Sequence, residues 1–519
     1  MTGGRAFPAA ALAAAIALPG ALGAGEIFYV SPDGNDGAAG SPGAPWRTLQ
    51  YAAGRVHAGD TVVARPGQYA GFDLRTSGSA GSYITFSAEA GARINADNPV
   101  TPDGINLEGA SFVVIEGFEI TGATRAGIRS VANDHVTIRG NRADANGRWG
   151  IFTGFSDDLL IEANVTSRSA AEHGIYVSNS GDRPTLRGNV SWGNRGCGIH
   201  MNGDISCGGD GVISDALVEA NVIYGNGLGG GSGINCDGVR DSLVRNNLIY
   251  DNHASGISLY QIDGGAASAD NVVVNNTIVQ ASDGRWAVNI SDGSTGNVLR
   301  NNVLYTYHPW RGSISISSDS LAGFESDYNA VMDRFSTNGG NSRIDLAEWQ
   351  GATGQDAHSF LAAPDELFVD PAGGDYRLFP SSPAIEGGGA AWAPSVDLAG
   401  IPRPMADDFD VGAYEYVPLP GDADLNGHVN YLDLGIVASR YERTGMGWRD
   451  GDFTGEAAVT YTDLGILATF YGQSDPTAGL PEPAAAVPEP AAAALLAAGA
   501  WTLFRKRRPR GAHGQANGA

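Results

Sequence analysis

Residues 150–164 read Gly-Ile-Phe-Thr-Gly-Phe-Ser-Asp-Asp-Leu-Leu-Ile-Glu-Ala-Asn, and residues 174–189 repeat the pattern as Gly-Ile-Tyr-Val-Ser-Asn-Ser-Gly-Asp-Arg-Pro-Thr-Leu-Arg-Gly-Asn. Both begin with Gly-Ile and end with an asparagine after a strand-like run. Gly-Ile recurs at Gly127, Gly150, Gly174, Gly198, Gly233 and Gly256, and the asparagines are Asn141, Asn164, Asn189, Asn221, Asn247, Asn276 and Asn302. Two short β-branched runs in each repeat of about 20–30 residues are typical of a stacked β-solenoid, so we predict an all-β fold.

The spacing within the repeats points to a candidate site. Most coils take 14 or 15 residues from the glycine to the asparagine, whereas the Gly198 coil takes 23 and the Gly256 coil takes 20. We expect the asparagines to form an inward corner ladder with a structural role. The two longer coils predict loops beside a groove, and loops on rigid scaffolds often carry function.

Strand alternation predicts which side chains face outward from the Gly-Ile strands. The residue after each isoleucine forms one column and the residue two further on forms the next. The resulting polar patch contains Tyr176, His200, Asn202, Asn235, Asp237 and Tyr260, with Arg129 farther along the same face. His173 directly precedes Gly174 and could reach this face, although a plain corner residue is an equal alternative.

Composition limits the function. A formal charge of −25 argues against nucleic-acid binding, and the only lysine is Lys506, so no lysine base serves the body of the protein. Residues 1–25 predict an export signal, with Arg5 before an apolar stretch and small residues at 23–25. Cys236 is expected in the core, while Cys197 and Cys207 flank one loop and could pair.

The first residues after this signal suggest a particular family. Residues 26–110 contain a helical stretch at 46–56 that would cover the first coil, followed by Gly59-Asp60-Thr61-Val62-Val63. With the repeats of residues 111–360, this resembles right-handed parallel β-helix proteins of the pectate-lyase type. Residues 361–417 resemble the closing segment of bacterial surface β-helix proteins, which we expect to be a terminal cap. The missing lysine departs from the lysine-based β-helix lyases.

Residues 420–474 predict a calcium-binding unit. Oxygen-bearing residues alternate around Gly427, and a second copy follows thirty residues later with Ala457 at the glycine position. The expected ligands are Asp422, Asp424, Asn426, His428, Asn430 and Asp433 in the first loop, and Asp452, Thr454, Glu456, Thr460 and Asp463 in the second. The duplicated loop and helix resemble a type I dockerin, which implies Ca²⁺, weaker in the second loop, and a cohesin-like partner.

The C-terminus predicts sorting to the cell surface. After a linker at 475–486, residues 487–508 carry Val-Pro-Glu-Pro, an apolar stretch and Arg505-Lys506-Arg507-Arg508. This order resembles a PEP-CTERM signal, which implies exosortase-type processing and a transient membrane association. The expected location is the cell surface, outer envelope or extracellular matrix.

Together these features predict action on an extracellular, uronic polysaccharide, by one of two mechanisms. In β-elimination His200 would be the base or a substrate ligand, Asp204, Asp210 and Asp237 would hold calcium, and Arg195 or Arg129 would neutralise the substrate carboxylate. In hydrolysis Asp237 and Asp204 would be acid and base. Substrate would contact Tyr176, Asn202, Asn235, Tyr260 and His173. The alternative is a non-catalytic glycan-binding or adhesive surface protein.

Overall fold

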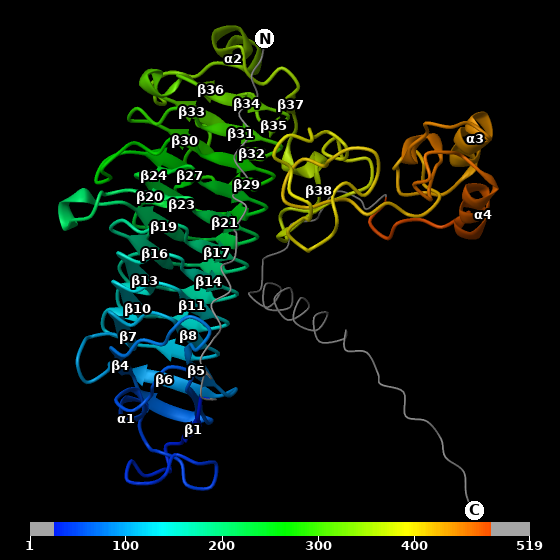
Figure 1. The fold of residues 1–519 in the computed structure, drawn as a ribbon. Helices are drawn as coiled ribbons and strands as arrows, with labels where there is room; N and C mark the ends of the chain where they lie inside the picture. Colours follow the sequence, from blue (N-terminus) through cyan, green and yellow to red (C-terminus); the bar gives the residue numbers. More distant parts are fainter. Residues whose placement is uncertain (1–24, 479–519) are drawn as a thin grey trace, which may run out of the picture.

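The computed structural model describes residues 25–478, so nearly all of the predicted export signal and the whole sorting tail lie outside the described residues. The described chain forms a long stack of coils, a segment packed on the side of that stack, and a small helical unit (Figure 1). None of the helices within 25–478 has the length and apolar character needed to cross a membrane.

Each coil contributes strands to three parallel sheets of 12, 11 and 12 strands. The first sheet contains β1 (Ile27–Val30), β2 (Thr61–Ala64), β5 (Ile84–Ala88), β8 (Val113–Glu116), β11 (Val136–Arg139), β14 (Leu160–Glu162), β17 (Thr185–Arg187), β21 (Leu217–Glu219), β25 (Leu243–Arg245), β28 (Val272–Val274), β31 (Val298–Arg300) and β34 (Glu325–Asp327). The second, here called the Gly-Ile sheet, contains β4 (Phe72–Leu74), β7 (Ile105–Glu108), β10 (Ala126–Val131), β13 (Trp149–Gly154), β16 (Ile175–Ser178), β19 (Ile199–Asn202), β23 (Ser232–Asp237), β27 (Ser255–Tyr260), β30 (Val288–Ile290), β33 (Ile314–Ile316) and β36 (Phe335–Ser336).

The third sheet was not predicted, because only two strand-like runs were recognised in each sequence repeat. Its strands follow the repeat asparagines directly, as β15 follows Asn164. They are β3 (Gly67–Ala70), β6 (Ala92–Ala96), β9 (Glu119–Thr121), β12 (Arg142–Asp144), β15 (Val165–Ser167), β18 (Val190–Trp192), β22 (Val222–Tyr224), β26 (Leu248–Tyr250), β29 (Thr277–Gln280), β32 (Val303–Thr306), β35 (Ala330–Val331) and β37 (Phe360–Leu361).

The Gly-Ile pairs are explained by the tight approach of successive coils. The isoleucines of these pairs are fully buried in the continuous core, where each contributes about 1.5–3 kcal/mol. A Cβ on Gly150 would lie 2.6 Å from the carbonyl oxygen of Gly174, and one on Gly174 would lie 2.1 Å from Ser191 Oγ. Glycine therefore precedes each isoleucine because no side chain fits there.

The inward asparagine ladder is confirmed. Asn221 is fully buried, and its Nδ2 donates to the carbonyl of Leu186 and to Oδ1 of Asn247, both at 2.9 Å. Its own Oδ1 accepts the backbone N–H of Asn189 at 2.9 Å. The same pattern links neighbouring coils along the stack, so these residues satisfy the backbone at the corners.

Helices lie at both ends of the stack (Figure 1). At the first end α1 (Leu49–Ala53) is shorter than the predicted stretch, yet Trp46 and Val56 are also buried. At the other end α2 (Leu346–Thr353) buries Trp349, whose ring stacks on Phe335 at 5.0 Å. The terminal position expected for the closing segment is therefore taken by α2.

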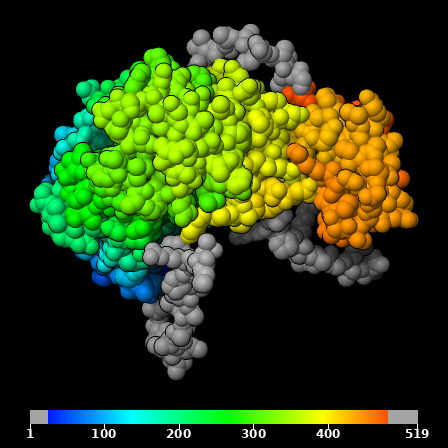
Figure 2. All heavy atoms as spheres, turned by 90° about the horizontal axis from the view of Figure 1, so that it is seen from above, coloured from blue at the N-terminus to red at the C-terminus, as the bar shows by residue number. Residues whose placement is uncertain are grey.

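The closing segment instead packs against the outer face of the third sheet, so the predicted terminal cap is wrong. Leu248, Val279 and Val303 of that sheet share one apolar cluster with residues of 362–425. This segment contains η3 (Pro364–Glu366) and an antiparallel pair, β38 (Phe368–Asp370) and β39 (Asp375–Leu378). Figure 2 shows it lying between the stack and the helical unit.

The helical unit contains α3 (Tyr431–Arg440), η4 (Trp448–Asp450) and α4 (Tyr461–Phe470), which enclose a small core around Val437 and Leu467. Ser381 N–H of the closing segment donates to the carbonyl of Leu425 at 2.9 Å, and Arg449 pairs with Glu386 at 2.5 Å. These contacts hold the unit against the closing segment.

Candidate functional site

The predicted columns on the Gly-Ile sheet are present. The strand register aligns Tyr176 with His200 and His200 with Asn235. In the next column Asn202 aligns with Asp237 and Asp237 with Tyr260. The structure therefore brings together the polar patch that strand alternation predicts.

The two longer coils form a single loop wall, defined here as residues 203–212 and 261–271. The first loop contains η1 (Ile205–Cys207), which projects from the stack at the level of β19 (Figure 1). Gly265 N–H donates to the carbonyl of Gly211 at 2.7 Å, and Ile205 N–H donates to the carbonyl of Asp263 at 3.0 Å. The loops therefore support one another, and β20 (Ile213–Ser214), directly after the first loop, pairs with β24 (Val239–Arg240), which follows β23.

The patch is less open than outward-facing columns suggest. His200 is 9% exposed, and Asn202, Asn235 and Asp237 are also buried. Asn235 donates to Tyr260 Oη at 2.6 Å and accepts from Ser232 Oγ, while Asn202 donates to Tyr176 Oη at 3.2 Å. The polar groups predicted to contact substrate are thus mostly bonded to one another.

Aromatic rings pack in a row beside the patch, in which Trp149 is buried and Phe152 and Tyr176 are half-buried. The Tyr176 ring stacks on His200 with centroids 4.8 Å apart, and it makes an edge-to-face contact with Phe152 of the preceding coil at 5.4 Å. Trp149 packs against Phe152 at 4.5 Å and donates its Nε1–H to Glu172 at 2.7 Å. Aromatic rings placed in this way suit contacts with the apolar faces of sugars.

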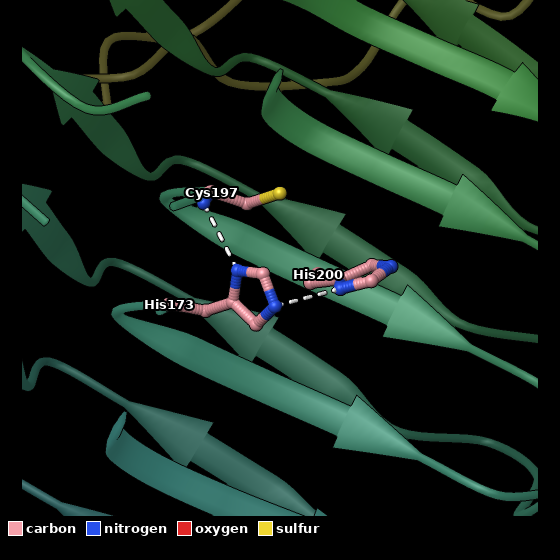
Figure 3. A group of neighbouring side chains, drawn as sticks. All are labelled: His173, Cys197 and His200. Carbon is pink, nitrogen blue, oxygen red and sulfur yellow. Dashed lines mark hydrogen bonds between the residues drawn. The ribbon is translucent and has the colours of Figure 1, made fainter. Parts of the chain in front are cut away.

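His173 and His200 form a hydrogen-bonded pair whose tautomers follow from the contacts (Figure 3). The backbone N–H of Cys197 donates to Nδ1 of His173 at 3.0 Å. A backbone N–H can only donate, so Nδ1 of His173 carries no proton and Nε2 does. Nε2 of His173 lies 3.1 Å from Nδ1 of His200, which must then accept, and this leaves the proton of neutral His200 on Nε2.

This pair corrects the predicted role of His200 as a base. Burial lowers the pKa of His173 to about 4, and burial followed by the neighbouring His173 lowers the pKa of His200 well below 6.5. Both rings are therefore neutral at pH 7, and Nε2 of His200 is a donor. It is shielded from solvent and has no hydrogen-bond partner among residues 25–478. The alternative role, a substrate ligand, agrees with these contacts.

The same contacts bear on metal binding. Ligand atoms of His173, Cys197 and His200 lie within 4.8 Å of one another, a set that suits Zn²⁺. A ligating imidazole normally donates its other ring N–H, whereas the second nitrogen of His173 accepts one. Sγ of Cys197 also already accepts the backbone N–H of Ser232 at 3.4 Å. This arrangement does not fit a metal centre.

Asp237 holds the loop wall in place. Its carboxylate accepts the backbone N–H groups of Ile262, Asp263 and Gly264 at 2.9–3.0 Å, and the side chain is buried. With both oxygens occupied it is an anchor rather than the acid, base or calcium ligand that the sequence predicted.

The predicted loop carboxylates are not gathered into a cluster. Asp204 accepts bonds from Ser206 and Cys207, and these bonds lower its pKa. Asp210 caps its own turn through Val212 N–H. Asp263, which was not assigned a role from sequence, is exposed and lies 3.5 Å from Asn202 Nδ2. Asn202 belongs to the patch, so this contact places the Asp263 carboxylate beside the patch.

The two predicted arginines differ. Arg129 bonds to Asn106 at 2.7 Å and pairs with Glu108 at 3.3 Å, so its charge is already neutralised. Arg195 is exposed and has no ion-pair partner among the described residues. Cys197, Cys207 and Cys236 are all free, so the suggested 197–207 disulfide is not formed.

The first loop of the helical unit gathers carboxylates as a cation site would. Oxygens of Asp422, Asp424 and Asp433 lie within 4.8 Å of one another. Burial, together with the charge of Asp433, raises the pKa of Asp422 to about 7. Such a concentration of buried carboxylates fits Ca²⁺, which takes oxygen ligands. In the second loop Glu456 instead accepts Thr460 Oγ1 at 2.8 Å, and Ala457 has a left-handed φ of 58°.

These features define the class first: three parallel sheets closed into coils, with buried asparagine ladders, form a parallel β-helix. Residues 28–289 match the family model described as "Pel9A-like, right handed beta helix region", and the chain belongs to this family. The predicted pectate-lyase-like, right-handed β-helix is thus confirmed.

The chain is similar to several known proteins, and the likeness to pectate lyase Pel9A supports the fold. The crystal structure of pectate lyase Pel9A aligns with a TM-score of 0.53 at 16% identity, covering 76% of this chain and 97% of that chain. A rhamnogalacturonan lyase aligns with a TM-score of 0.39, also at 16% identity, covering 59% and 87%. The uncharacterized protein YwoF of Bacillus subtilis (strain 168) is 28% identical over 212 residues, which is 35% of this chain and 44% of YwoF. This match therefore spans less than half of YwoF.

Proposed function

We propose that this protein acts on an extracellular polysaccharide that contains uronic acid, bound along the aromatic surface of the Gly-Ile sheet. Its family and its likeness to pectate lyase Pel9A support action on polysaccharide. The observation that carries the proposal is the neutral His200, which holds an unpartnered, buried Nε2–H beside Tyr176.

The proposed part of His200 is to donate Nε2–H to a substrate oxygen that becomes more negative in the reaction. A neutral imidazole held by a fixed partner can stabilise such an oxygen without itself gaining a proton. Since Nε2 is enclosed, the groups that cover it have to move before substrate reaches it. Tyr176 would contact a sugar ring, and His173 would position His200 through the 3.1 Å bond.

The proton acceptor would come from the loop wall. Asp237 is occupied by three backbone donors, and both histidines are fixed as neutral rings. Asp263 is exposed and lies near Asn202, so it is the carboxylate we assign to this role. β-Elimination can use a carboxylate in this position as its base, whereas glycosidic hydrolysis would also require a general acid, usually a second carboxyl group.

The test incubates the full-length protein with acidic and neutral polysaccharides. New double-bond absorbance would identify β-elimination, and new reducing ends without that absorbance would identify hydrolysis. His200→Gln and Asp263→Asn should each lower turnover at least about 100-fold. His57→Gln is the matched control, because its side chain is 87% exposed. Unchanged turnover in His200→Gln would overturn the assigned role.

A second candidate is glycan binding without catalysis. The backbone hydrogen bonds that occupy Asp237 favour glycan binding alone, because they leave the patch with few groups able to exchange a proton. Saturable binding of a polysaccharide, with no product from any of the panel, would select this alternative.

We also propose that the helical unit binds Ca²⁺ and displays the β-helix at the cell surface. Asp422, Asp424 and Asp433 would be the carboxylate ligands, joined by Asn426, the backbone at His428 and Asn430, with a weaker site in the second loop. The close set of carboxylates and the raised pKa of Asp422 support the first site. Calcium titration followed by calorimetry tests it, and Asp424→Asn should weaken binding.

A further inference from the structure

One corner of the stack carries arginines in an early and a late group of coils. It lies between the third sheet and the Gly-Ile sheet, and its arginines stand within four residues of the next Gly-Ile strand. Arg125 and Arg148 precede β10 and β13, and Arg285, Arg311 and Arg334 precede β30, β33 and β36. His173 and Arg195 lie on this same corner, ahead of β16 and β19.

The early and late arginines differ in their partners. Arg125 pairs with buried Asp103 at 2.6 Å, and Arg148 pairs with Glu172 at 2.7 Å. Within residues 25–478, neither Arg285 nor Arg311 has a side-chain hydrogen bond or an ion pair. Arg334 donates only to the backbone carbonyls of His308 and Arg311, at 2.7 and 3.1 Å. The early arginines of this corner are therefore neutralised by carboxylates, whereas the late arginines are not.

No carboxylate within residues 25–478 forms an ion pair with the late arginines. Burial and then the charge of Arg285 lower the pKa of Arg311, so these two cations lie close to each other. Asp283, two residues before Arg285, bonds to His253 at 2.9 Å, and Asp333 accepts the N–H of Leu346 at 2.7 Å. Both carboxylates keep their charge, but Arg285, Arg311 and Arg334 stay without an ion-pair partner among these residues, in a chain with a formal charge of −25.

Aromatic side chains accompany this charge. Trp310 is 39% exposed and packs edge-on against buried Trp286 at 5.9 Å. Tyr307, at the start of the same loop, is 46% exposed. Arg334 and Arg343 hold that loop through its carbonyls, so the exposed rings are fixed in place.

We infer that Arg285, Arg311 and Trp310 form a binding surface for a stretch of carboxylate-bearing polysaccharide away from the reaction site. Guanidinium groups bind carboxylates in a bidentate manner, and an exposed tryptophan packs on a sugar face. The surface lies three to four strand steps beyond β19, about 14–19 Å along the stack from His200. The inference rests on the proposed function for the class of ligand, and it places a long chain across both sites.

The test measures binding separately from turnover. The full-length protein is titrated by calorimetry with polygalacturonate and alginate, and with methyl-esterified polygalacturonate, which lacks the charge. We expect tighter binding of at least one charged polymer than of the esterified form, and an approximately tenfold loss in Arg285→Gln/Arg311→Gln. Arg139→Gln is the matched control, because Arg139 is surface-exposed but paired with Glu116 at 2.7 Å.

The outcomes separate this surface from the reaction site. Equal affinity of the wild-type protein for charged and esterified polymers would overturn the inference, and so would an unchanged affinity of the double variant. Failure of His200→Gln to alter turnover would instead overturn the proposed function while leaving these affinities in place. If both proposals hold, the double variant should cleave short oligosaccharides at the wild-type rate and show a raised KM only for polymer.

Discussion

His173→Phe tests the tautomer assignment on which the site depends. Phenylalanine keeps the ring packing against Tyr176 and His200, at 5.0 and 4.6 Å, but it removes both nitrogens. Neutral His200 then loses the hydrogen bond that fixes Nδ1 as an acceptor. A neutral hydrogen bond is worth about 1 kcal/mol, so the pKa of His200 should rise by roughly one unit. It should stay below 6.5, because burial is the larger cause of the lowered pKa.

The measurement is NMR of the histidine ring nitrogens across a pH titration. Wild-type His200 should carry its proton on Nε2 at pH 7 and remain neutral well below pH 6.5, with exposed His57 as the internal reference. The variant also leaves the N–H of Cys197 without its acceptor, which should cost about 1–3 kcal/mol of stability. A wild-type His200 that titrates near 6.5, or that carries its proton on Nδ1, would refute the reasoning.

Three further predictions concern stability. Asn221→Ala removes the partners of buried Asn189 N–H and Leu186 C=O, so it should lower the free energy of unfolding by about 3 kcal/mol in chemical denaturation. Asn95→Ala, at an exposed position, should lower it by under about 0.5 kcal/mol. Similar losses in the two variants would contradict a buried asparagine ladder. Ala457→Gly relieves a left-handed φ of 58° and should raise the free energy of unfolding of the helical unit by about 1 kcal/mol, seen as a higher thermal midpoint. A lower midpoint would count against this assignment. Folding lowers the pKa of His173 from 6.5 to about 4, so the unfolded chain takes up a proton at a higher pH than the folded chain does. The free energy of unfolding should therefore fall by roughly 3 kcal/mol as the pH drops from 6.5 to 4. The variant His173→Phe should lack that part of the acid sensitivity.

The sequence was sufficient for the architecture because its signals are local. The close approach of coils requires glycine before isoleucine, and the corner backbone requires an asparagine amide, so both recur with the coil. Period-two alternation then places Tyr176, His200 and Asn235 in one column. The third strand of each coil was missed because it contains only three residues in β15 or β18, which is too short for a periodic pattern.

The chemistry of the site depended on contacts between distant residues. The assignment of His200 as a donor requires Cys197 N–H to meet His173, 24 residues away in the chain. Asp237 looks like a free outward carboxylate in its strand, and only the path of residues 262–264 shows that its oxygens are occupied. The position of the closing segment likewise follows from Asn275 Nδ2 donating to the carbonyl of Asp410, 135 residues away.

The enclosed Nε2–H of His200 links these observations to function. A buried donor without a partner costs about 1–3 kcal/mol, and the surrounding chain has groups that could satisfy it. Asn235 is the aligned neighbour, yet its oxygen accepts from Ser232 and its amide donates to Tyr260. The local bonds therefore hold Asn235 away from His200 and leave one donor unsatisfied at the centre of an otherwise bonded patch. An oxygen atom of a bound sugar that reaches Nε2 would remove that cost, so this unsatisfied donor should favour ligand binding.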